Sequence, residues 1–183
     1  ILRAVPIGGR LWVFKETSIE HWINNGSGGL AALAGSTVDK GLQAFNLLSP
    51  IPGGCFFVGN DDTPYLVNGG SMGRISTVGV ESSIKTETPE AAFYYEDEGH
   101  KFCVLVFSDR PAWVYDIATA EWSERAEGLD LGPWSAKAAA GAYGEFYVGG
   151  AVGAISKLLR NNVDTSGAMI RKAVSETIQN EGK

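Results

Sequence analysis

The densest group of residues that could do chemistry is Glu96-Asp97-Glu98-Gly99-His100, which contains one of the two histidines of the chain. A metal site needs converging ligands, but adjacent residues of a hairpin point to opposite sides, and no second His or Cys lies at motif distance. We therefore predict a solvated turn at 96–100. The segment 60–62, NDD, is also interpreted as a turn, because it lacks the alternating acidic residues and closing Glu of a calcium loop.

The second histidine, His21, alternates with Ile19 and Ile23, so these three side chains are expected on one face of a strand. That pattern favours a hydrogen-bonded core histidine over a catalytic base. No nucleophile elbow Gly-x-Ser-x-Gly occurs, and the glycine-rich segment 149–154, GGAVGA, has Ala where the second and third glycines of a dinucleotide fingerprint would fall. We predict no catalytic residue, no cofactor and no metal site, and we expect no enzyme activity.

The elements that position these residues are clearest in residues 92–125. Apolar runs at 92–95, 102–107 and 112–115 are separated by turn residues at 97–99 and 109–111, and a fourth short segment surrounds Trp122. This pattern predicts a four-stranded antiparallel meander, as in a propeller blade. Because a lone blade cannot bury both of its faces, further blades are expected in the same chain.

Internal repeats support this expectation. Four strand cores lie at 10–14, 55–59, 101–105 and 145–149, and Val13, Val58, Val104 and Val148 recur at intervals of 45, 46 and 44 residues. Propeller blades recur at about 40–50 residues. A second strand is expected after each core, at 18–22, 64–67, 112–115 and 153–158.

The predicted fold is therefore all-β and β-propeller-like, with about four antiparallel blade repeats in a single domain, 1–183. The predicted units are 1–48, 49–90, 91–135 and 136–183. Two alternatives stay open: a closed four-bladed propeller, which is uncommon, or four blades of a larger ring. The start at Ile1, without Met or a signal-like region, favours a fragment or a processed product.

Some segments have ambiguous patterns. Residues 31–48 are predicted as β, with a short helix as the alternative, and 74–85 as a strand or a helix beside a blade. The segments 24–30 and 68–73 are predicted loops, and 168–175 is predicted as an outer strand in preference to a helix.

Composition narrows the class of protein. The chain is 44% hydrophobic and 20% charged, and it has 24 glycines, as expected of a folded, turn-rich β protein. A net charge of −6 without a dense basic run argues against a general nucleic-acid binder. Cys55 and Cys103 lie in apolar runs and are expected to be buried free thiols.

Two features resemble the kelch-type blade: the diglycine at 149–150 after a hydrophobic strand, and Tyr115-Asp116 followed by Trp122. In such a blade Asp116 is expected to cap a turn through backbone N–H groups. Trp122 is expected to pack between blades.

Three longer segments, 11–22, 73–81 and 99–125, are together similar to the packaged-DNA stabilisation proteins of short-tailed bacteriophages, their tail-hub or head-completion components. The sequence departs from that pattern at Trp122-Ser123-Glu124-Arg125, where the family has Trp-His-Glu-Arg, and at 106–110, where it tends to Thr-Phe-Pro.

The resemblance implies a structural virion component that is assembled in the host cytoplasm and located in the phage tail or neck. Several copies would form a hub that closes the portal channel and docks a portal adaptor, spike, fibre or needle. A homo-oligomer is implied, with no membrane partner and at most indirect contact with DNA. The acidic balance suits a channel surface that repels DNA.

Candidate partner contacts are polar residues expected in exposed loops: Lys15, Glu16, Asn24, Asn25, Asn68 and Arg74. The alternative function is a kelch-like propeller that binds carbohydrate or acts as an enzyme. Such a propeller would gather His, Tyr, Glu and Arg on loops at one end of its channel.

Overall fold

The computed structural model describes residues 1–26, 28–128, 130–150, 153–158, 163–164 and 167–168. Apolar strands separated by glycine-rich turns form four antiparallel sheets in chain order, each a meander of sequential neighbours. The fold is all-β and propeller-like, with four blade-like sheets, as the repeats predict.

The first three sheets have four strands each, and the fourth has three among the described residues. Sheet 1 contains β1 (Arg3–Ile7), β2 (Arg10–Phe14), β3 (Ile19–Asn24) and β4 (Leu30–Ala32). Sheet 2 contains β5 (Leu48–Ile51), β6 (Gly54–Val58), β7 (Pro64–Asn68) and β8 (Ser71–Arg74). Sheet 3 contains β9 (Ala91–Asp97), β10 (His100–Val106), β11 (Ala112–Asp116) and β12 (Glu121–Arg125). Sheet 4 contains β13 (Ala136–Ala142), β14 (Glu145–Gly150) and β15 (Ile155–Lys157). A 3₁₀ turn η1 (Phe45–Leu47) precedes β5, α1 (Val78–Thr86) links sheets 2 and 3, and β16 (Val163–Asp164) pairs with β17 (Gly167–Ala168).

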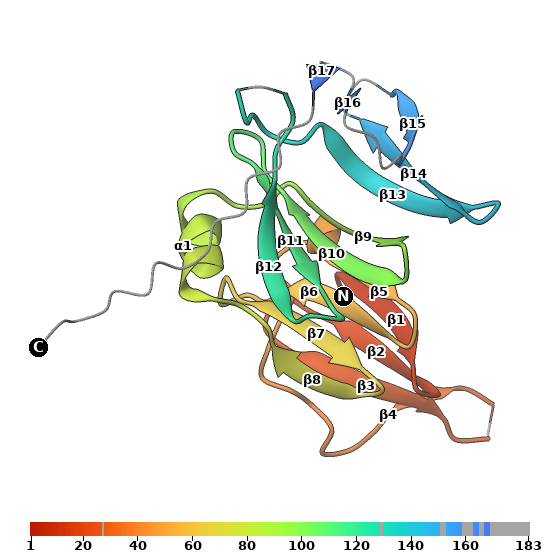
Figure 1. The fold of residues 1–183 in the computed structure, drawn as a ribbon. Coiled ribbons are helices and arrows are strands. Elements are labelled where there is room, and N and C mark those ends of the chain that lie inside the picture. Colours follow the sequence, from red (N-terminus) through yellow and green to blue (C-terminus); the bar gives the residue numbers. More distant parts are fainter. Residues whose placement is uncertain (27, 129, 151–152, 159–162, 165–166, 169–183) are drawn as a thin grey trace, which may run out of the picture.

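The sheets are stacked in sequence order, with sheet 1 at the bottom and sheet 4 at the top of Figure 1. In sheets 2 and 3, β6 and β10 are apolar on both faces, so each contributes to two cores. Phe57 of β6 packs in the core between sheets 1 and 2, whereas the adjacent Phe56 packs in the core between sheets 2 and 3. Val104 of β10 packs in a third core, between sheets 3 and 4. Three apolar interfaces therefore join the four sheets.

A meander of four strands starts and finishes at the same end of its sheet. We call this the linker end, because the segments that join successive sheets run there, and the opposite end the hairpin end. Hairpins at the hairpin end are tight. Glu98 and Gly99 between β9 and β10, and Tyr143 and Gly144 between β13 and β14, all have positive φ, which two-residue turns of the primed types require.

Several expectations for local structure are confirmed. Residues 92–125 form the four strands β9 to β12, and the predicted second strands correspond to β3, β7, β11 and β15. The turn predicted at 96–100 lies at 98–99, between β9 and β10. Residues 60–62 also form a turn, with Asp62 at a φ of 58°. Cys55 and Cys103 are buried free thiols, and burial raises the pKa of Cys55 to about 12.

Other expectations are wrong. In the segment predicted as β at 31–48, only 31–32, the end of β4, belong to a strand before η1. Two of its leucines are buried without a strand: Leu42 lies in the core between sheets 1 and 2, and Leu47 in the next core. The predicted loop at 68–73 is a two-residue turn, Gly69-Gly70, between β7 and β8.

In the segment 74–85, the helix alternative holds for α1, which buries Val80 and Ile84 against the core between sheets 2 and 3. In the segment 24–30, Asn24 lies in β3 and Leu30 in β4, and the described residues between them, 25–26 and 28–29, form a loop. The prediction of an outer strand at 168–175 lies outside the described residues, apart from Ala168 in β17.

The four valines that set the repeat lie in equivalent strands but not on equivalent faces. Val104 faces sheet 4, whereas Val148 of sheet 4 faces sheet 3. Val13 lies outside the core that its neighbours Trp12 and Phe14 form. Because side chains alternate along a strand, a difference of one residue between repeats reverses the face.

Candidate functional site

A series of polar contacts at the linker end crosses from each sheet to the next. The Arg3 guanidinium of sheet 1 donates to the backbone oxygens of Leu48 at 2.5 Å and Phe45 at 3.1 Å, and lies 5.0 Å from the centre of the Phe45 ring. Arg3 thereby satisfies carbonyl groups at the point where η1 leads into β5.

The same kind of contact continues toward sheets 3 and 4. The Asn46 side chain donates to the backbone oxygen of Glu90, just before β9, and the Glu90 carboxylate pairs with Lys137 of β13. The backbone oxygen of Glu90 thus accepts a hydrogen bond from the segment that precedes sheet 2, and its carboxylate binds sheet 4. Sheets 1 to 4 are joined by polar contacts as well as by apolar cores.

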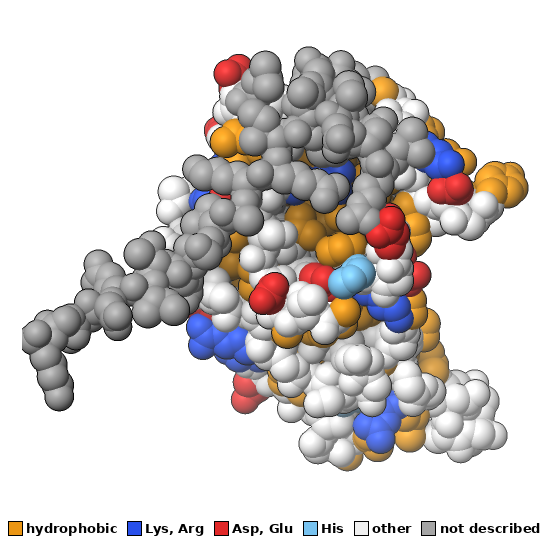
Figure 2. Space-filling view, viewed as in Figure 1, with side chains coloured by type: hydrophobic (Ala, Val, Ile, Leu, Met, Phe, Trp, Pro, Cys, Tyr) orange, Lys and Arg blue, Asp and Glu red, His pale blue; other side chains and the backbone are white. Residues whose placement is uncertain are grey.

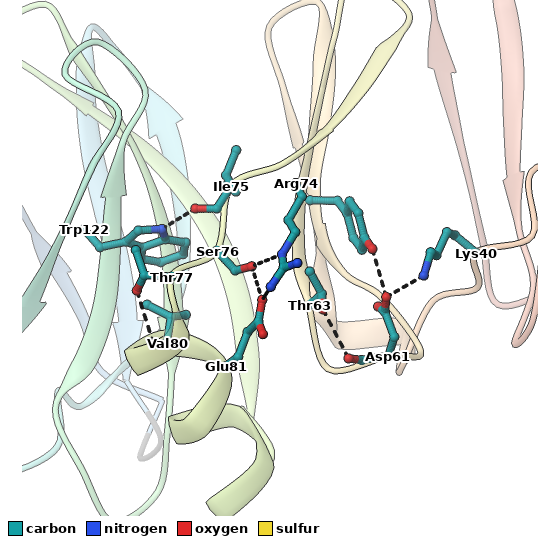
Figure 3. A network of polar contacts seen from close by, with 11 residues as sticks. Lys40, Asp61, Thr63, Arg74, Ile75, Ser76, Thr77, Val80, Glu81 and Trp122 are labelled. Atoms are coloured by element: carbon teal, nitrogen blue, oxygen red, sulfur yellow. Dashed lines mark hydrogen bonds and ion pairs between the residues drawn. The ribbon is translucent and has the colours of Figure 1, made fainter.

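A second network fixes the turn at 60–62 against the linker between sheets 1 and 2 (Figure 3). Asp61 accepts from Lys40 at 2.6 Å and from the Tyr65 hydroxyl at 2.9 Å. Burial alone would raise the pKa of Asp61, but these two donors outweigh it and the pKa is lowered. Gly41 is confined there, since a Cβ on it would lie 1.8 Å from the backbone oxygen of Glu16.

A third network lies between sheet 2 and α1 (Figure 3). Arg74 at the end of β8 contacts Ser76 and the Glu81 carboxylate, and the hydroxyl of Ser76 donates to the same carboxylate. These hydrogen bonds lower the pKa of Glu81, with Ser76 the largest cause. Thr77 caps the helix by accepting from the Val80 N–H at 3.4 Å.

The two kelch-like expectations are confirmed in the geometry. Asp116 accepts from the backbone N–H of Ala118 at 2.8 Å and so caps the turn between β11 and β12. The indole N–H of Trp122 donates to the Ile75 oxygen at 2.7 Å, and its ring packs in the core between sheets 2 and 3, against Phe56 and Tyr115.

The six candidate contact residues do not form one site. Lys15, Glu16 and Arg74 lie at the linker end, and Asn24, Asn25 and Asn68 at the hairpin end, because successive turns of a meander alternate between ends. Lys15 pairs with Glu20, which lowers the pKa of that glutamate. Arg74 is bound to Glu81 as described above. The Asn24 side chain accepts from the Gly26 N–H at 2.9 Å.

The histidines differ in environment. His21 packs on Trp12 with ring centres 4.2 Å apart and ring planes tilted by 56°, and its buried Nε2 has no hydrogen-bond partner among the described residues. The prediction of a hydrogen-bonded core histidine is thus not confirmed at Nε2: His21 is half-buried and packs on an aromatic ring. Burial, and secondarily the charge of Arg10, lower its pKa. His100 pairs through Nδ1 with Asp116 at 2.6 Å and is exposed at the hairpin end.

Sequence reasoning missed the linker-end residues Arg3, Asn46, Glu90 and Lys137. A signal for them exists in the spacing: Arg3 and Leu48 are 45 residues apart, Asn46 and Glu90 are 44, and Glu90 and Lys137 are 47. These distances along the chain match the repeat interval. Polar residues one repeat apart therefore meet where neighbouring sheets meet.

Charges on the surface are interspersed. On the face in Figure 2, acidic and basic side chains lie in small separate groups, beside hydrophobic ones. Within the described part of the chain, no group of three or more His, Cys, Asp or Glu could hold a metal ion. No helix among these residues is long and apolar enough to cross a membrane.

Comparison with known proteins gives little information. No family model matches the chain, and no curated protein matches it. Among solved structures, the crystal structure of the computationally designed Ika4 protein is similar with a TM-score of 0.45 and 14% sequence identity, over 85% of this chain and 88% of that chain. At this level of similarity the match does not establish a fold, so the propeller-like description rests on the four sheets themselves.

Proposed function

We propose that this protein is a structural component of the tail or neck of a short-tailed bacteriophage. In this role it stabilises packaged DNA by closing the portal channel and docking other tail proteins, and it acts through protein–protein interfaces instead of catalysis. The expected partners are a portal adaptor and a spike or needle. Contact with DNA is at most indirect.

The observation that carries the structural role is the use of the polar groups at the linker end. Arg3, Asn46, Glu90 and Lys137 bind the neighbouring sheet. Polar side chains at a catalytic or sugar-binding site would converge on a space for the ligand. Those of the linker end instead hold the sheets in fixed relative positions, as a load-resisting scaffold requires.

The placement in a phage rests on the similarity of segments 11–22, 73–81 and 99–125 to packaged-DNA stabilisation proteins. The net charge of −6 is compatible with a channel component, because an acidic surface does not retain passing DNA.

The test is deletion of the gene from the phage genome that carries it. We expect particles that package DNA but release it, seen as empty heads by electron microscopy and as DNase-sensitive DNA. Mass spectrometry of purified wild-type particles should detect the protein. Expression of the wild-type chain from a plasmid should restore stable particles.

A different result would contradict the role in a clear way. Infectious, DNA-filled particles that lack the protein would exclude a function in DNA retention. Deletion particles that never package DNA would place the protein in packaging instead.

One observation favours the alternative of a carbohydrate-binding or enzymatic blade module. His100 is held by Asp116, and its ring stacks on the Phe102 ring with centres 5.9 Å apart, so a paired histidine and carboxylate occur together with an aromatic ring at the hairpin end. A glycan array with the wild-type chain and the His100→Ala variant tests it. Binding that the substitution abolishes would favour this alternative.

A further inference from the structure

The outer faces of the two terminal sheets remain unused by the three cores. We propose that they bind each other between two copies of this chain, so that the outer face of sheet 4 in one copy packs on the outer face of sheet 1 in the other. This proposal extends the structural role above, on which it partly rests, by naming the partner surface.

The outer face of sheet 1 is apolar and carries bulky side chains. Strand register places on this face the residues that alternate with the core residues of β1 to β4. The apolar members are Ala4, Pro6, Leu11, Val13, Trp22, Leu30 and Ala32. Leu30 is 55% exposed, and Leu11 and Trp22 are partly exposed. The Trp22 indole donates to Glu20, whose carboxylate also holds Lys15 on the same side of the sheet.

The outer face of sheet 4 is mostly apolar too, and its side chains on β13 are small. The register of β13, β14 and β15 places on it Ala138, Ala140, Ala142, Tyr147, Gly149 and Ile155. Ile155 is 77% exposed, and the three alanines are exposed. The same register places Glu145 and Lys157 on this face, where they form an ion pair at 2.7 Å.

Stacked repeats need polar outer faces on their terminal units to stay separate in water. Each terminal sheet instead has a mainly apolar outer face that carries one ion pair, Lys15–Glu20 on sheet 1 and Glu145–Lys157 on sheet 4. Both present apolar residues on the positions that, in the other sheets, are buried against a neighbour. Each terminal sheet therefore presents an outer face similar to those that pack against a neighbouring sheet at the three internal interfaces.

The two faces fit each other better than either fits itself. Bulky Leu11 and Trp22 need space opposite them, which the alanines and Gly149 of sheet 4 provide. Two sheet 4 faces together would leave gaps between small side chains, and two sheet 1 faces would oppose bulky ones. This argues for a head-to-tail contact, as at each internal interface, where one sheet presents its forward face and the next its rear face.

A head-to-tail contact closes into a ring when the rotation between copies allows it. Two copies of four sheets contain eight sheets, within the range of about four to eight blades known for propellers. The inferred assembly is a closed dimer with two identical junctions.

The experiment measures association of the 183-residue chain by analytical ultracentrifugation over a dilution series. Ala32→Lys changes an exposed position on the sheet 1 face, and Ile155→Glu one on the sheet 4 face. Each should raise the dissociation constant by about tenfold or more, because each places a charge in both junctions. Val78→Glu, on the exposed first turn of α1, is the matched control and should leave the dimer unchanged.

Mixing the two variants distinguishes the contact types. In a head-to-tail dimer of Ala32→Lys with Ile155→Glu, one junction is wild type. The other junction opposes the introduced ammonium group to the introduced carboxylate, so mixing should restore association. A monomer at all concentrations would overturn the proposal, as would an association that only one of the two substitutions weakens.

Circular dichroism confirms that each variant is folded. A monomeric protein that is nevertheless needed for DNA retention would refute this dimer and leave the virion role supported.

Discussion

Trp122 offers a direct test of how neighbouring sheets are held together. It belongs to the outermost strand of sheet 3, yet its indole N–H donates to the Ile75 oxygen, in the segment that follows sheet 2. Replacing Trp122 by Phe keeps an aromatic ring in the core but removes the donor.

The expected cost follows from two contributions. An acceptor left without its partner costs about 1–3 kcal/mol when buried, and the lower half of that range applies because Trp122 is only partly buried. The smaller ring loses roughly 0.5 kcal/mol of apolar burial. The free energy of unfolding should therefore fall by about 1.5–2.5 kcal/mol, which lowers Tm by about 3–10 °C for a domain of this size.

Trp113 provides a matched control on the adjacent strand β11. It lies in the same core, 6.4 Å from Trp122 between ring centres, but its indole nitrogen has no hydrogen-bond partner within the described residues. Trp113→Phe loses ring area alone and should cost less than about 1 kcal/mol. Thermal melts and urea titrations followed by circular dichroism would measure both variants. Equal destabilisation by Trp122→Phe and Trp113→Phe would show that the hydrogen bond to Ile75 contributes nothing.

Three other predictions concern single positions. Gly54→Ala should destabilise the protein by about 3 kcal/mol or more, because a Cβ would lie 1.7 Å from the Val67 backbone oxygen. Gly73→Ala is the control: a Cβ there meets open space, so the free energy of unfolding should change by less than about 1 kcal/mol in the same urea titrations. Asp61→Asn should destabilise at neutral pH. Because the pKa of Asp61 is lowered in the folded state, its contribution to the free energy of unfolding is present above about pH 4 and is lost as the pH falls through the folded pKa. The Tm values of variant and wild type should therefore converge in acid. A difference in Tm that stays constant with pH would refute this. Cys55, with a pKa of about 12, should not react with a thiol reagent at about pH 8 until the chain is unfolded in denaturant, and rapid labelling of the native protein would contradict its burial.

The sheets could be predicted because each strand and turn is specified locally. The run 102–107 is apolar along its whole length, which suits a strand with neighbours on both faces, and Glu98-Gly99 supplies the positive φ of a tight turn. The prediction of a strand at 31–48 is wrong because it treats Leu42 and Leu47 as strand residues. An apolar side chain indicates that a residue is buried, but it does not show that the residue lies in a strand. The linker in which they lie crosses from one core to the next, and only the stacking of sheets shows this.

The linker-end contacts were harder to predict, because no local pattern marks them. Asn46, Glu90 and Lys137 are ordinary surface residue types, and their pairing depends on three sheets being placed side by side. The six loop residues chosen as candidate contacts were selected for exposure alone. That criterion does not distinguish the two ends of a meander, and it does not reveal that Arg74 is already bound to Glu81.

The even number of strands in sheets 1 to 3 has a consequence for how such a chain can change over evolutionary time. Because the backbone enters and leaves each of these sheets at one end, a tandem duplication of a gene segment encoding one sheet would insert a complete layer without rerouting its neighbours. An inserted layer would bring its own apolar faces, while the hairpin end would keep only short turns. In sheet 4, the three described strands take the chain to the hairpin end at Lys157. Gain or loss of layers is therefore expected among the first three sheets.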